Sequence, residues 1–135
     1  MDIVNEVKKL NLPDGQYVVF GSGILAAKGI RPARDIDLLV LPELFKQLQK
    51  NGWKRKYFFR RVLTCKLITH ANVEAFSHAY HGRYRTSVEE LIQSAEIING
   101  VPFMNLNELK NFKVALGRPK DLKDAMLINK YIQRH

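Results

Sequence analysis

Two short motifs near the start of the chain contain residues whose types and spacing suit phosphate chemistry. One is Asp35-Ile36-Asp37, at the start of an apolar segment. Side chains alternate across a strand, so the two carboxylates share one face, roughly 7 Å apart, and repel each other by about 2 kcal/mol at an effective dielectric of about 20. A divalent cation converts that repulsion into binding, because carboxylates are preferred ligands of Mg²⁺ and Mn²⁺. The pair therefore predicts a metal site.

The second motif is the glycine-serine turn Gly21-Ser22-Gly23, expected directly after a strand and before a helix. Backbone N–H groups and the positive end of a helix at such a turn favour a bound phosphate. The alternative for the acids is a solvated strand edge paired with Arg31 or Arg34, but that alternative does not account for the turn. A phosphate turn beside a paired-carboxylate strand is what phosphoryl or nucleotidyl transfer requires.

The elements that position these motifs follow from hydrophobic periodicity and from glycine and proline punctuation. The turn is expected between a strand over 16–20 and a short helix over 24–28, and the acidic pair opens a strand over 35–41. Asn99-Gly100 is a hairpin signal. The remaining expected helices start after Asp2 and cover 42–50, 87–94, 107–116 and 119–133, and the remaining strands cover 53–59, 62–69, 72–77, 95–98 and 101–104.

Length and composition predict one soluble domain over residues 1–135. A chain of 135 residues with 46% hydrophobic content can bury one sizeable core but not two. Its single cysteine, Cys65, and the absence of a leader-like N-terminus predict a reduced, cytoplasmic setting. The apolar stretches are only a few residues long, so no membrane span is expected.

The net charge of +9 is large for this size and predicts an anionic partner. Such a field attracts phosphates and adds affinity for polynucleotides through counterion release, although a merely soluble basic surface explains the charge equally well. The most crowded basic segment contains Lys54, Arg55, Lys56, Arg60, Arg61 and Lys66.

Taken together, the G-S-G at 21–23 and the D-I-D at 35–37 resemble the pattern of the polymerase-beta-like nucleotidyltransferase superfamily. Residues 18–40 are similar to the opening of its small prokaryotic members, toxin-type and stand-alone, and residues 108–128 resemble their closing helices. The middle of the chain is only vaguely similar. The resemblance implies an α+β fold: a nucleotidyltransferase-type mixed β-sheet, with helices packed mainly on one face and a C-terminal helical pair.

The resemblance also implies a site. Members carry a third carboxylate on a later strand, often Asp, and Glu74 is the residue of this chain that suits that place; an ion pair between Glu74 and Lys66 is the open alternative. Asp35, Asp37 and Glu74 would hold Mg²⁺ or Mn²⁺ and serve catalysis, and Gly21 and Ser22 would hold the phosphates of an NTP. Positive charge for the triphosphate would come from Lys113, Arg118 and Lys120.

The resemblance leaves the acceptor open among RNA or a tRNA end, a protein hydroxyl and a small molecule. It also implies a possible protein partner of toxin–antitoxin type. From another class of function, the alternative is a catalytically inactive module that keeps the same fold and binds nucleotide or nucleic acid.

Overall fold

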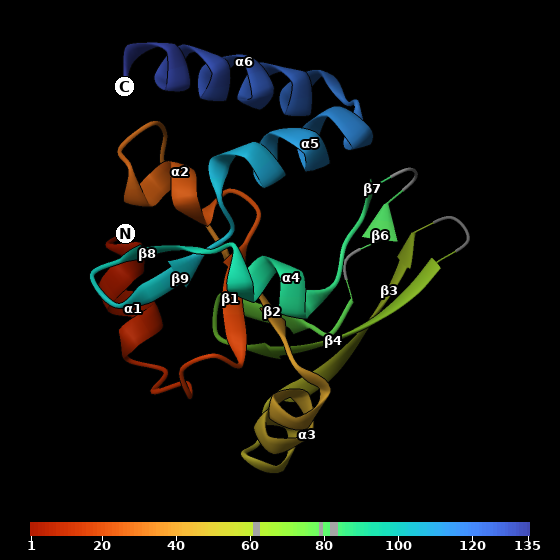
Figure 1. Ribbon diagram of the computed structural model, residues 1–135. Helices are drawn as coiled ribbons and strands as arrows, with labels where there is room; N and C mark the ends of the chain where they lie inside the picture. Colours follow the sequence, from red (N-terminus) through yellow and green to blue (C-terminus); the bar gives the residue numbers. More distant parts are fainter. Residues whose placement is uncertain (61–62, 79, 82–83) are drawn as a thin grey trace.

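The computed structural model describes residues 1–60, 63–78, 80–81 and 84–135. Within these residues, seven strands form one mixed sheet in the order β3-β4-β5-β2-β1-β9-β8, and two more form a separate small hairpin (Figure 1). The large sheet consists of β1 (Tyr17–Phe20), β2 (Ile36–Val40), β3 (Lys54–Arg60), β4 (Leu63–His70), β5 (Val73–Phe76), β8 (Glu96–Ile98) and β9 (Val101–Phe103), and the small hairpin of β6 (Tyr80–His81) and β7 (Tyr84–Arg85). The helices are α1 (Ile3–Lys8), α2 (Gly23–Ala27), α3 (Pro42–Lys50), α4 (Val88–Gln93), α5 (Leu106–Leu116) and α6 (Pro119–Arg134).

The centre of the sheet joins segments that are distant in the sequence. Strand β1 pairs antiparallel with β2 and parallel with β9, and β2 pairs parallel with β5. The parallel β2–β5 pair sets the acidic segment beside a strand that begins more than thirty residues later. The mixed sheet and the C-terminal helical pair confirm the predicted α+β class. The β6–β7 hairpin was not expected, because strands of two residues leave no periodic signal.

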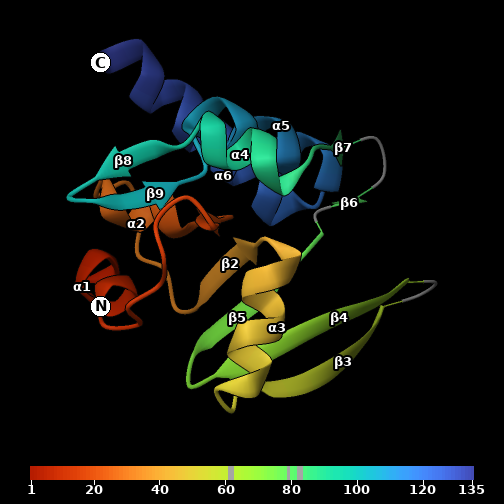
Figure 2. The same cartoon turned by 60° about the horizontal axis from the view of Figure 1, so that its bottom comes forward.

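Alternation along the strands divides the side chains between the two faces of the sheet. On the face that carries Val19, α1 and α2 pack closely: a Cβ added at Gly23 would lie 2.5 Å from Val19 Cγ1 and 3.0 Å from Ile3 Cδ1. Helix α3 packs against β4 and lies in front of it in Figure 2. The opposite face carries Phe20 and Asp37, and it receives α5.

Helix α5 is fixed on that face at both ends and in its middle. Asn105 caps its start by accepting a hydrogen bond from the backbone N–H of Glu108 at 2.9 Å, and Gly117 ends it in the left-handed conformation (φ +68°). The ring of Phe112 packs edge-on against Phe20 at 4.8 Å and against Tyr84 at 5.1 Å. These contacts hold α5, with α6 stacked above it in Figure 1, over the end of β1.

None of the helices in the described part of the chain is both long enough and apolar enough to cross a bilayer.

Candidate functional site

The strand register sets two carboxylates side by side on the face that receives α5. Asp37 of β2 is the direct neighbour of Glu74 of β5, and on its other side it is the neighbour of Phe20 of β1. Both acids are partly buried. Asp35 lies one residue before β2 and is exposed. The three acids predicted from the sequence therefore lie on or immediately before neighbouring strands.

Burial and the neighbouring acids together make Asp37 unusually basic. Burial raises the pKa of Asp37 to about 6, with further upward contributions from the charges of Glu74 and Asp35; the charge of Lys113 opposes them. Both causes penalise the ionised form, because a carboxylate loses hydration on burial and gains repulsion from like charges. At neutral pH the carboxylate is still mostly ionised, so it is held there at a cost that a cation would remove.

The glycine-serine turn lies directly against this acid. Gly21 has φ +71°, a conformation that glycine adopts without strain, and a Cβ added there would lie 3.8 Å from Asp37 Oδ2. Ser22 stands at the N-cap position of α2 without giving that helix a side-chain cap. Because α2 has only five residues, the helix itself adds little positive potential, and phosphate recognition would depend on the turn and on nearby cations.

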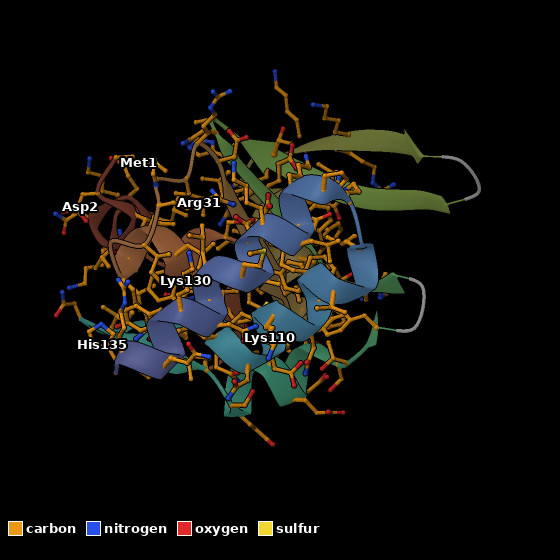
Figure 3. All side chains as sticks on the ribbon, turned by 90° about the horizontal axis from the view of Figure 1, so that it is seen from above. Met1, Asp2, Arg31, Lys110, Lys130 and His135 are labelled. Carbon is orange, nitrogen blue, oxygen red and sulfur yellow. The ribbon has the colours of Figure 1, made fainter. Side chains whose placement is uncertain are left out.

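The cations come from a network that α5, α6 and the connection before β2 form together. Lys113 of α5 is buried, and its Nζ lies 3.0 Å from Asp124 Oδ2 and 3.6 Å from Asp121 Oδ1. Arg118 donates from Nε and Nη2 to the two oxygens of Asp121 at 2.6 and 3.2 Å. Arg31 donates from Nε and Nη2 to the two oxygens of Asp124, both at 2.7 Å, and Figure 3 shows Arg31 beside α6.

The two aspartates of this network behave in the opposite way to Asp37. Burial alone would raise the pKa of Asp124, but hydrogen bonds from Arg31 and Lys113 outweigh it and hold the pKa below its ordinary value. At Asp121 burial is likewise outweighed, by Arg118 first and then by Lys113, and its pKa is also lowered. Three cations and two carboxylates thus form a well-paired cluster with one net positive charge.

The three basic residues predicted to serve the triphosphate occupy different positions. Lys113 is the one whose charge acts on Asp37. Arg118 is engaged by Asp121, which lies three residues later at the start of α6. Lys120 is exposed at the start of α6.

The structure also bears on the open alternatives. The register places Thr69, not Lys66, opposite Glu74, and the side chain of Lys66 lies outside the described residues. Arg31 pairs with Asp124 instead of with the acidic motif. Arg31 and Asp124 are the residues that sequence reasoning missed. They lie 93 positions apart, so no local spacing joins them; the only signal was the spacing of Asp121 and Asp124, which puts both on one face of α6.

The acids suit a divalent ion in type and in charge, since the charge of a cation would favour the ionised form of Asp37 and so oppose the effects of burial and of the neighbouring acids. In residues 1–60, 63–78, 80–81 and 84–135, no three His, Cys, Asp or Glu side chains converge tightly enough to hold an ion by themselves. Mg²⁺ commonly uses one or two carboxylates and takes its other ligands from water and substrate phosphates. The donor set fits such an open site.

The fold has a counterpart among solved structures. The chain is similar to the crystal structure of ANT(2")-Ia in complex with adenylyl-2"-tobramycin, over 97% of this chain and 86% of that chain, with a TM-score of 0.52 and 17% sequence identity. That protein is an aminoglycoside nucleotidyltransferase, so this chain has the fold of a nucleotidyltransferase. No protein-family model and no curated protein sequence matches the chain.

Proposed function

We propose that this protein transfers a nucleotidyl group from an NTP to an acceptor in a reaction that depends on Mg²⁺ or Mn²⁺. The observation that carries the proposal is the register that sets Asp37 beside Glu74, with the Gly21 turn against the same carboxylate. The likeness of the fold to that of a nucleotidyltransferase supports the same reaction class.

The metal would be held by Asp35 and Asp37, with Glu74 completing the site. When bound, the ion would supply positive charge to the triphosphate and fix its orientation. The raised pKa of Asp37 supports this assignment, because burial and two neighbouring acids leave negative charge there that no ion pair within the described residues offsets.

The triphosphate would lie between the acids and the cation cluster. The backbone of Gly21 and the hydroxyl of Ser22 would donate hydrogen bonds to the β- and γ-phosphates. Lys113 would add positive charge from α5, and Arg118 and Lys120 would extend the positive potential along the start of α6.

The acceptor would approach from the side of Glu74. Its hydroxyl would lose a proton to Glu74 or Asp37, and its oxygen would form a bond to the α-phosphorus as the bond from that phosphorus to the pyrophosphate oxygen breaks. Pyrophosphate leaves with the electron pair of that bond.

The test is transfer of label. The protein is incubated with each α-³²P-labelled NTP, with Mg²⁺ or Mn²⁺, and with total RNA, cell lysate or a small aminoglycoside such as tobramycin. We expect metal-dependent labelling that disappears in Asp35→Ala and Asp37→Ala and persists in Glu89→Ala, a control acid that is exposed on α4. Persistence of labelling in the two aspartate variants would contradict the proposal.

The separate arms identify the acceptor. The net charge of +9 favours an anionic acceptor over a cationic one, so we expect RNA, including tRNA ends, to be labelled in preference to tobramycin. A labelled protein in the lysate arm would point instead to a protein hydroxyl and to a partner of toxin–antitoxin type. Binding of NTP without labelling in any arm would identify the catalytically inactive module.

A further inference from the structure

Arg31 makes contacts that join the glycine-serine turn to the last helix. Besides its two bonds to Asp124, its Nη2 donates to Ser22 Oγ at 2.9 Å and its Nη1 donates to the carbonyl oxygen of Pro32 at 2.9 Å. Asp124 is buried, with 8% of its side chain exposed, whereas 32% of the Arg31 side chain is exposed. The guanidinium is therefore held from one side by a buried carboxylate and is aimed at the turn on the other.

The direction of the bond to Ser22 fixes what that serine can do. A guanidinium has only donors, so Ser22 Oγ must accept, and the hydrogen of its own hydroxyl must point elsewhere. Ser22 Oγ does not accept from a backbone N–H of α2, and in the part of the chain that the structure describes the Ser22 hydroxyl donates to no acceptor. The turn, whose Gly21 lies against Asp37, is thus left with one hydroxyl donor that the protein does not use.

We propose that Arg31, anchored on Asp124, is a positioning residue that orients the Ser22 hydroxyl as a hydrogen-bond donor to the phosphates of the NTP. The inference rests on the proposed function, since it concerns the same triphosphate. The role assigned to Arg31 is to act through Ser22, since four of its five N–H donors already bond within the protein.

Asp124 gives this arrangement a second consequence. Its Oδ2 accepts from Arg31 and also lies 3.0 Å from Lys113 Nζ. One carboxylate therefore positions both the arginine that contacts the turn and the lysine whose charge acts on Asp37. The phosphate side and the acidic side of the site are therefore aligned to a common anchor in the last helix.

The test is a double-mutant cycle on nucleotide binding. Dissociation constants for α,β-methylene NTPs, which cannot release pyrophosphate, are measured with Mg²⁺ by calorimetry for the wild type, Ser22→Ala, Arg31→Gln and the double variant. We expect each single variant to bind about tenfold more weakly, as for the loss of one hydrogen bond to a charged group. If Arg31 acts through Ser22, the double variant binds within about twofold of the single variants.

Lys28→Gln is the matched control, because it removes one charge and one ion pair, with Glu96, at the other side of α2. It should leave binding unchanged. Arg31→Lys keeps the positive charge beside Asp124 but cannot make the two-point bond of a guanidinium. It is the variant to use if Arg31→Gln does not fold. Its effect on binding should also vanish in the Ser22→Ala background.

Additive effects, with the double variant about a hundredfold weaker than the wild type, would overturn the inference while leaving the proposed function intact. An unchanged affinity in Arg31→Gln would do the same. If the wild type binds none of the analogues with either metal, the proposed function itself fails, and the inference fails with it.

Discussion

Asp37 on the sheet and Asp124 on the last helix are both shielded from water, yet their pKa values move in opposite directions. The pKa of Asp37 rises to about 6 because burial and the charges of Glu74 and Asp35 outweigh the charge of Lys113. That of Asp124 falls because Arg31 and Lys113 both bond to it. Burial penalises either carboxylate; the difference lies in the partners that the fold provides.

The two regions differ in whether the protein itself supplies the opposite charge to its carboxylates. On the α5–α6 side, the carboxylates of Asp121 and Asp124 each accept a two-point bond from an arginine and share Lys113. On the β2–β5 side, like charges are neighbours in register. A buried group whose charge is opposed instead of paired is a mark of functional sites, and the proposed metal ion would supply the opposite charge here.

The largest expected difference between the two regions is in catalysis. Glu74→Gln keeps the size of the side chain but removes its charge and its ability to accept a proton. Loss of a general base costs about a hundred- to ten-thousand-fold in rate, so we expect label transfer to fall by that factor while the binding of α,β-methylene NTPs changes little. Glu89→Gln serves as the control. If label transfer and analogue binding fell by the same factor, Glu74 would contribute to nucleotide binding and not to proton transfer.

The next effect is on stability and is expected on the paired side. Asp124→Ala leaves Arg31 and the buried Lys113 without their carboxylate, and removal of one partner of a buried pair costs about 3–5 kcal/mol; because Arg31 is partly exposed, we expect about 3 kcal/mol. Urea denaturation at neutral pH measures the change. A loss below about 1 kcal/mol would show that the cluster is held together by other contacts.

The smallest effect has the opposite sign and is expected on the unpaired side. The pKa of Asp37 in the folded protein, about 6, exceeds the ordinary value of 3.8, so the native state binds this proton more tightly than the unfolded state does. Asp37 therefore lowers the free energy of unfolding as the pH rises from about 4 through 6. Asp37→Asn should therefore stabilise the metal-free protein at pH 7, by about 1–2 kcal/mol after allowance for solvent exposure. The gain should disappear at pH 4. Destabilisation at pH 7 would contradict the assignment of an uncompensated charge.

The sequence predicted the acidic region better than the paired one, and the reason is the range of the interactions. Strand alternation and glycine punctuation are local, so the turn at 21–23, the strand after Asp35 and the closing helices were predictable. The strand itself starts at Ile36, one residue later than expected. That Glu74 belongs with Asp35 and Asp37 was expected only through a family resemblance, because register between distant strands leaves no local pattern.

The cation network was accessible only in part. Arg118 and Asp121 lie only three residues apart, so their pairing is local in the sequence. Arg31 and Asp124 were brought together by the docking of α5 and α6 on the sheet, which depends on the packing of Phe112 against Phe20 and Tyr84. The β6–β7 hairpin that carries Tyr84 was itself unexpected, so the contacts that it supports could not be anticipated.

The most direct test of the central claim is the titration of the Asp37 carboxyl carbon by NMR, assigned by its loss in Asp37→Asn. In the metal-free protein we expect a pKa of about 6, and on addition of Mg²⁺ with an α,β-methylene NTP we expect it to fall below that value. An ordinary pKa in the free protein, or a raised one that Mg²⁺ and nucleotide leave unchanged, would contradict the account.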